Sequence, residues 1–171
     1  YDIYHRQEII KAGVIPASLI NNNAAFTPQM MGFDPPGNIY THVAGIDIIR
    51  TGPNNFSVLE DNLRVPSGVS YMLENRETMM HMFPELFEKN RVRSVEHYPH
   101  QLYRSLCECF DGYTDATPTV SLLSPGVYNS AYFEHAFLAD QMGVELIEGA
   151  DLVYHDGRVA QRTTAGPQNI D

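Results

Sequence analysis

The chain has 171 residues, of which 43% are hydrophobic, and its 11 basic and 21 acidic residues give a formal charge of −10. A chain this apolar can bury enough surface to offset the entropy lost on folding, which excludes an intrinsically disordered protein. The negative charge argues against nucleic-acid and anionic-membrane partners, since both need a basic face. No apolar run approaches the roughly 20 residues of a membrane span. The two cysteines, Cys107 and Cys109, are too few for a disulfide scaffold and indicate a reducing, cytoplasmic setting.

The first 38 residues predict little regular structure. Apolar residues between Ile3 and Ile10 predict a short helix that ends at Gly13, and residues 21–38 are dense in turn formers. The chain starts with Tyr1 and reads as ordered from its first residues. We therefore expect it to be a fragment of a larger protein.

A hairpin and a group of helices are predicted next. Strand patterns at 39–50 and 56–64 are separated by turn residues. A predicted helix over 69–81 follows Pro66, and residues 84–110 are predicted to be helical with a break near Pro99. The linker-like stretch 111–118 marks the predicted boundary between two parts, 1–112 and 117–171.

The second part predicts a βαβ unit. Strands at 119–123 and 144–147 flank a helix over 130–142, and such strands are parallel with a right-handed crossover. A last hairpin, 152–155 with 158–162, turns on Asp156-Gly157. The predicted fold class is therefore mixed α/β: an antiparallel hairpin with helices, followed by a Rossmann-like βαβ lobe.

The first hairpin is predicted to gather oxygen-bearing side chains. We take the register that pairs Arg50 with Ser57. In this register Asp47 faces Glu60, and Asn62 lies on the same face because side chains alternate along a strand. Opposed carboxylates destabilise a sheet unless a cation neutralises them, and Mg²⁺ or Mn²⁺ prefers such oxygen ligands. The alternative is a solvated hairpin, and a one-residue slip would separate the two carboxylates.

Anion-binding groups are predicted beside this face. Arg64 follows on the same face, and the helix that begins after Ser67 and Gly68 offers free N–H groups to a phosphate. The alternative for the serines here, Ser67 and Ser70, is an ordinary helix N-cap.

A second candidate contact lies in the βαβ unit. Asn129 and Ser130 follow the strand at 119–123, at the strand end where α/β sheets bind ligands. An N-cap role is the alternative here too. His97 and His100 lack the partners of a zinc site.

These motifs resemble the circularly permuted ATP-grasp proteins, bacterial proteins related in fold to glutathionylspermidine synthetase. The resemblance runs from about Gly13 to Thr164. Its most specific block is Glu60-x-Asn62-x-Arg64 with the following residues to Arg76. A second block is Ser124-Pro125-Gly126-Val127-Tyr128-Asn129-Ser130 with the following residues to His135.

The resemblance implies an ATP-dependent carboxylate–amine ligase, which forms an acyl phosphate and then an amide or peptide bond. Asp47, Glu60 and Asn62 match the family's ligands for the metal of Mg-ATP. Arg64 would act as a catalytic residue facing the phosphates. ATP with Mg²⁺ or Mn²⁺ is the implied cofactor, and a small carboxylate, amine or peptide is the implied substrate.

Two departures from the family pattern bear on partners. Gly45 stands where the spermidine-conjugating relatives have a basic residue, which argues against the same substrates. ATP-grasp enzymes hold the nucleotide with lysines of a separate lobe, and this chain has only Lys11 and Lys89. We therefore expect a missing lobe of the same protein as a partner, docked on a face rich in apolar residues.

Two other functions stay open from the sequence. The chain could belong to a catalytically silent relative that binds a nucleotide or a protein. It could also be an acidic α/β scaffold in which Asp47 and Glu60 never meet. The sequence does not identify the carboxylate, the amine or the oligomeric state.

Overall fold

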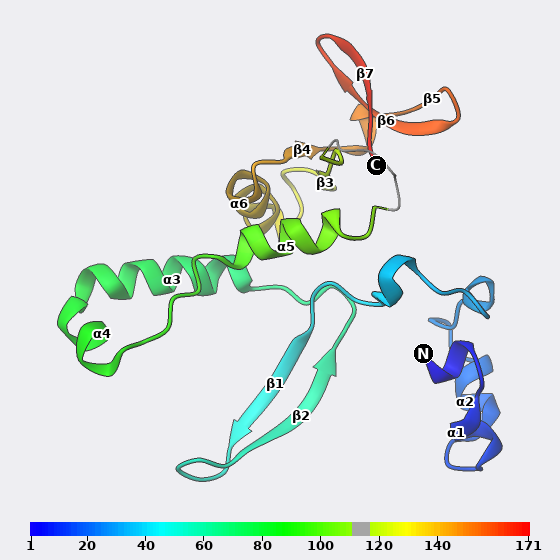
Figure 1. Cartoon of the computed structure of the whole chain (residues 1–171), viewed down its shortest axis with the longest axis horizontal. Coiled ribbons are helices and arrows are strands. Elements are labelled where there is room, and N and C mark those ends of the chain that lie inside the picture. The colour runs from blue at the N-terminus through cyan, green and yellow to red at the C-terminus, as the bar shows by residue number, and fades with distance from the viewer. Residues whose placement is uncertain (111–116) are drawn as a thin grey trace. The chain divides into compact units, whose positions relative to one another are not determined.

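The computed structural model describes residues 1–110 and 117–171, and the chain divides into two compact units, Tyr1–Tyr40 and Thr41–Asp171 (Figure 1). Most of the linker predicted at 111–118 lies outside the described residues. Within those residues, no helix combines the length and the apolar character needed to cross a membrane.

Short helical segments make up the first unit. The helix predicted before Gly13 is divided in two, because Gln7 takes a left-handed conformation with φ of 53°. The Asp2 carboxylate accepts the N–H groups of Glu8 and Ile9, both at 3.0 Å, and so starts the second piece. The segments, which include turns inside the predicted loop region, are η1 (Asp2–Tyr4), α1 (Glu8–Lys11), α2 (Ala17–Asn21), η2 (Pro28–Met30) and η3 (Pro36–Asn38).

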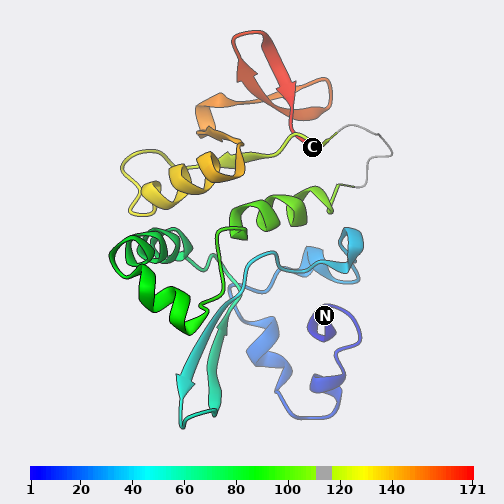
Figure 2. The ribbon, with the colours of Figure 1, turned by 60° about the vertical axis from the view of Figure 1, so that its left-hand side comes forward.

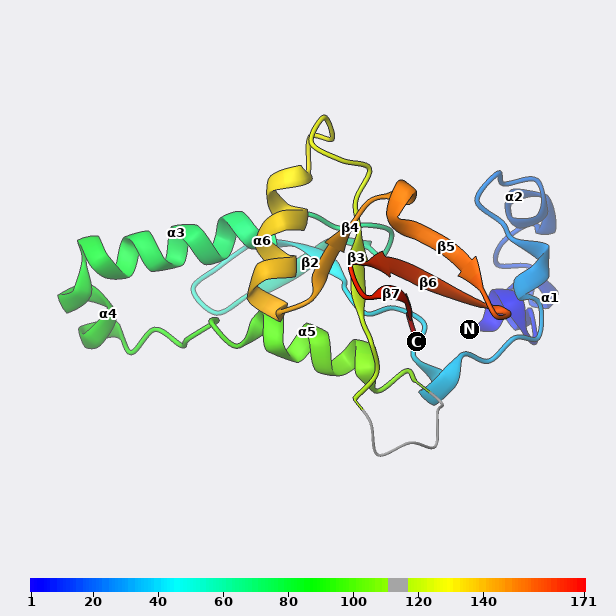
Figure 3. The same cartoon turned by 90° about the horizontal axis from the view of Figure 1, so that it is seen from above.

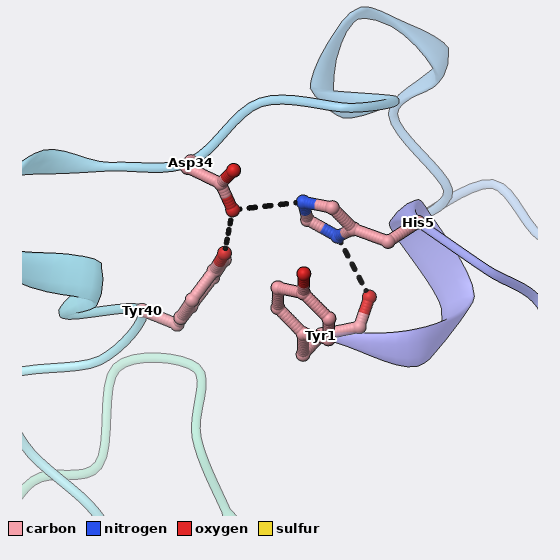
Figure 4. Close-up of polar contacts among 4 residues, drawn as sticks. All are labelled: Tyr1, His5, Asp34 and Tyr40. Carbon is pink, nitrogen blue, oxygen red and sulfur yellow. Dashed lines mark hydrogen bonds and ion pairs between the residues drawn. The ribbon is translucent and has the colours of Figure 1, made fainter.

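His5 links three parts of this unit (Figure 4). Its Nδ1 lies 2.9 Å from the carbonyl oxygen of Tyr1, and its Nε2 lies 2.9 Å from Oδ1 of Asp34. The same carboxylate oxygen accepts the O–H of Tyr40 at 2.7 Å. Both ring nitrogens of His5 are engaged in contacts within this unit. This histidine therefore has a structural role, with no nitrogen left for a metal or for proton transfer.

Tyr40 is expected to ionise at unusually high pH. Partial burial and the hydrogen bond to Asp34 raise the pKa of Tyr40 from 10.0 to about 12. The stabilising effect of this contact is therefore complete below pH 10 and is lost as the pH rises toward 12. Ultraviolet titration should show one tyrosine that ionises near pH 12, and Tyr40→Phe should remove that step. An identical titration curve for Tyr40→Phe would contradict the assignment.

The second unit begins with an antiparallel hairpin of β1 (Gly45–Arg50) and β2 (Phe56–Asn62). The predicted pairing of Asp47 with Glu60 is confirmed. The register then shifts by one residue, so Arg50 pairs with Phe56 and the predicted pairing of Arg50 with Ser57 is wrong. The cause is a β-bulge: Leu59 is an extra residue on β2 without a partner on β1.

Three helices follow the hairpin (Figure 1). They are α3 (Val69–Met82), α4 (Pro84–Asn90) and α5 (Tyr98–Cys107). The predicted helix over 69–81 is confirmed to within one residue. The predicted helical stretch 84–110 breaks earlier than expected, at Arg91, whose φ of 48° ends α4.

The predicted βαβ unit is confirmed. Strands β3 (Ser121–Leu123) and β4 (Glu145–Ile147) pair in parallel, and α6 (Tyr132–Met142) connects them (Figure 3). The helix begins two residues later than Ser130, since Asn129 and its neighbours form a turn first. Gly143, with φ of 69°, ends it as predicted.

A three-stranded antiparallel sheet completes the unit, in the order β5 (Leu152–His155), β6 (Arg158–Thr163), β7 (Gly166–Asn169), after the short turn η4 (Gly149–Asp151) (Figure 2). The predicted turn at Asp156-Gly157 is confirmed. Strand β7 was not predicted. It contains Pro167, and proline is compatible with a strand only at a sheet edge, which is where β7 lies. Ala160 on β6 and Ile147 on β4 are buried.

Candidate functional site

The β1–β2 hairpin has one polar and one apolar face. The register places Asp47, Glu60 and Asn62 on the same face. The opposite face carries four large apolar side chains that are 50–64% exposed: Ile46, Ile48, Phe56 and Val58. We call these the polar face and the apolar face, although Ile49 also lies on the polar face and Asp61 and Arg50 lie on the apolar face.

The polar face offers oxygen ligands suited to a hard cation. Asn62 Nδ2 lies 3.4 Å from Glu60 Oε1, so these two side chains meet on the face that Asp47 shares. Among the described residues no three His, Cys, Asp or Glu side chains form a metal cluster. Two carboxylates and an amide are nevertheless the type of set that Mg²⁺ uses, since it keeps several positions for water and phosphate. The donors therefore fit the metal that the sequence suggested.

Gly45 begins β1 where the backbone passes close to Pro66. A Cβ atom at residue 45 would lie 2.8 Å from Cβ of Pro66, so any side chain there requires a shift of the backbone. This close approach gives a physical reason for glycine at the position where the spermidine-conjugating relatives have a basic residue.

The segment between β2 and α3 turns sharply beside Arg64. Val65 has φ of 46°, a left-handed conformation that is a true outlier for a β-branched residue. Arg64 is exposed and lies two residues beyond Asn62. The strained turn therefore directs the chain from the carboxylate face toward the start of α3.

A buried carboxylate from α6 caps the start of α3. Glu134 Oε2 accepts the N–H of Gly68 at 2.8 Å, the N–H of Ser70 at 3.1 Å and the hydroxyl of Ser70 at 2.8 Å. Glu134 is only 6% exposed and Ser70 is fully buried. The alternative of a local N-cap by Ser67 or Ser70 is wrong, because α3 has no side-chain cap of its own. In this structure a carboxylate fills the anion position at the helix N-terminus.

The charge of Glu134 is stabilised by these donors. Burial by itself raises the pKa of a carboxyl group. The hydrogen bonds from Gly68 and Ser70, with a smaller contribution from His135, outweigh burial and hold the pKa of Glu134 below its ordinary value of 4.5. Glu134 is therefore ionised at neutral pH and acts as a fixed anchor between α3 and α6.

The loop before α6 contains the second predicted contact. Asn129 Oδ1 accepts the N–H of Ala131 at 2.9 Å, so this side chain stabilises the turn that leads into α6. Ser130 is exposed. At the start of the loop, Ser124 Oγ lies 3.0 Å from His135 Nδ1 and accepts the N–H of Gly126 at 3.1 Å.

Glu134 connects the two blocks on which the family resemblance rests. It belongs to the second block and binds residues of the first, 64 and 66 positions earlier. Its role was missed in the sequence, where a local cap was considered instead. A signal was present, since Glu134 and His135 are the polar residues in an otherwise apolar stretch of this helix from Tyr132 to Ala139.

Comparison with known proteins matches the whole chain to one family. The model described as "A circularly permuted ATPgrasp" covers residues 1–171. An uncharacterized protein of Mycobacterium tuberculosis is 53% identical over 170 residues, which are 99% of this chain and 31% of the relative. An uncharacterized protein of Synechocystis is 46% identical over 99% of this chain and 35% of its own length.

More distant relatives bear a functional name. A protein of Frankia casuarinae named "Putative glutamate--cysteine ligase 2-2" is 36% identical over 162 residues, which are 95% of this chain and 19% of that protein. The chain thus spans about a third of the length of the more similar curated relatives. What the whole protein does must therefore be inferred from the part that these residues form.

Proposed function

Because the chain belongs to the circularly permuted ATP-grasp family, we propose that it supplies the metal-binding face of an ATP-dependent ligase that joins a carboxylate to an amine. One observation supports this most: the hairpin register sets Asp47 opposite Glu60, with Asn62 beside them. The ligase name of the Frankia relative agrees with it. ATP and a divalent cation are the cofactors of the proposal.

In this proposal Asp47, Glu60 and Asn62 hold Mg²⁺ or Mn²⁺. When bound, the metal neutralises charge on the phosphates during phosphoryl transfer. Arg64, exposed beside this face, donates hydrogen bonds to phosphate oxygens of ATP or of the acyl phosphate. Arginine suits this task because its planar guanidinium binds phosphate through two parallel N–H groups.

The remaining predicted contacts take supporting roles in the proposal. Ser67 and Ser130 are exposed and can offer hydroxyl groups to the nucleotide or the substrate. Gly68 gives its N–H to Glu134 and, with φ of 104°, leads the chain into α3 in a conformation that favours glycine. Asn129 shapes the loop that presents Ser130.

The apolar face of the hairpin suits a docked lobe. Four exposed apolar residues on one face of a two-stranded sheet are unfavourable in water, and an isolated hairpin is marginally stable. We propose that a nucleotide-clamping lobe of the longer protein covers this face. The polar face then stays open for the metal.

The test compares Glu60→Gln with Asp61→Asn. Both remove one negative charge from β2, but Asp61 pairs with Ile46 and so lies on the apolar face. Titration of Mn²⁺ into the chain, followed by electron paramagnetic resonance, should show binding that Glu60→Gln weakens at least about tenfold and Asp61→Asn leaves nearly unchanged. Equal effects of the two substitutions would remove the hairpin from the metal site.

Turnover is tested in a longer protein that carries this chain. ADP release with Mg-ATP, a carboxylate and an amine should fall in Glu60→Gln and Asp47→Asn and persist in Asp61→Asn. Nucleotide binding without any ADP release would favour the alternative of a catalytically silent binding module.

A further inference from the structure

Away from the hairpin, a cysteine, a histidine and a serine meet at the end of α5. Cys109 Sγ lies 3.7 Å from His42 Nε2, and Ser105 Oγ lies 3.3 Å from His42 Nδ1. The thiol also lies 3.5 Å from the carbonyl oxygen of Ser105, which is its alternative hydrogen-bond acceptor. His42 is 63 and 67 residues from its two partners, so the fold and not local sequence creates this group. Cys109 is half-buried and His42 is exposed. The thiol is therefore reachable from solvent beside a base.

We propose that Cys109 is a thiol activated by His42 and a site of oxidation by peroxide. Ser105 holds Nδ1 and so directs Nε2 toward the sulfur, which is the arrangement of a nucleophile, a base and a group that orients the base. When the thiol proton moves to His42, both ring nitrogens carry protons. One N–H then donates to Ser105 Oγ and the other to the thiolate.

The proposed reaction is a two-electron oxidation. The thiolate sulfur attacks one oxygen of the peroxide, an S–O bond forms and the O–O bond breaks. Sulfur is oxidised to sulfenic acid, and the second oxygen of the peroxide is reduced and leaves as hydroxide. The hydroxide takes the proton from His42 and becomes water. A thiol can then condense with the sulfenic acid to form a disulfide and release water, and a second thiol can reduce that disulfide and restore Cys109.

The neighbouring Cys107 serves as an internal comparison. Its partner is the phenol of Tyr103, whose pKa is raised by that hydrogen bond, and among the residues that the structure describes its sulfur forms no hydrogen bond with a histidine. Within the described part of this segment, which ends at residue 110, the charged neighbours of Cys109 are Arg104 and Glu108, and they pair with each other at 3.5 Å. Their charges are opposite, so we assign the difference between the two thiols to His42.

The experiment measures alkylation of Cys109 by iodoacetamide between pH 5 and 9 in a Cys107→Ser background. His42→Gln should lower the rate at pH 7 by about tenfold and move the rise of the profile to higher pH. Ser105→Ala should lower it less, and His100→Gln, the matched control, should leave it unchanged. Circular dichroism identifies any variant that does not fold.

Peroxide treatment followed by dimedone tests the oxidation itself. Mass spectrometry of the otherwise unaltered chain should find the sulfenic acid adduct mainly on Cys109 and much less of it in His42→Gln. Equal labelling of Cys107 and Cys109 would overturn the proposal. So would alkylation profiles that are the same with and without His42.

Discussion

Replacing Glu134 by alanine is expected to lower the free energy of unfolding by about 3 kcal/mol or more, because each buried donor left without a partner costs about 1–3 kcal/mol. The donors in question are the N–H groups of Gly68 and Ser70 and the hydroxyl of Ser70. Glu134→Gln keeps one acceptor oxygen but removes the charge, so its cost should be smaller, about 2 kcal/mol. Urea unfolding followed by circular dichroism measures both.

The matched control is Glu145→Gln on β4. Glu145 is exposed, so the same chemical change should alter stability by less than about 0.5 kcal/mol. If Glu134→Gln proved no more destabilising than Glu145→Gln, the cap on α3 would have no measurable value. Contacts other than those of Glu134 would then have to hold α3 and α6 together.

The contribution of Glu134 also has a predicted pH dependence. The pKa of Glu134 is lower in the folded chain than its ordinary value of 4.5. Its stabilising effect is therefore fully present above pH 4.5 and is lost as the pH falls through the folded-state pKa. The difference in stability between the natural chain and Glu134→Gln should shrink on acidification over this range.

Much of the hairpin was predictable because its determinants are local. Alternating side chains and a turn at residues 51–55 set the ends of both strands beside the turn, whereas β1 begins at Gly45 and not at residue 39 as predicted. The pairing of Asp47 with Glu60 followed from that arrangement. The bulge at Leu59 was not predictable in this way, since no residue type marks it, and it moved the pairing of every residue nearer the turn.

The cap on α3 was not predictable because its determinant is distant. Local rules point to serine at the helix start, and the serines present are Ser67 and Ser70. The structure uses a carboxylate from another helix, and Ser70 becomes a buried donor to it. The contact between His42 and Cys109 was hidden for the same reason, because nothing in the sequence near one indicates the other.

The 171 residues by themselves are expected to bind ATP only at millimolar concentrations. ATP carries up to four negative charges, the chain has a net charge of −10, and two of its carboxylates lie on the proposed metal face. Arg50, although at the end of β1, donates to the carbonyls of Gly52 and Pro53 and lies 6.0 Å from the ring centre of Phe56 on the apolar face. It therefore does not serve the phosphates.

The two lysines do not supply the positive charge that the phosphates of ATP need. Lys89 lies in the last turn of α4, and Lys11 belongs to the other compact unit. Without Mg²⁺ the negative charge of the chain should repel ATP. With Mg²⁺, ATP should gain one weak contact, through the metal. Isothermal titration of ATP, with and without Mg²⁺, should find no submicromolar site in either case.

A longer protein that adds a basic lobe should bind at least about a thousandfold more tightly, a difference of about 4 kcal/mol. Submicromolar binding by these residues alone would show that the nucleotide site is already complete within them.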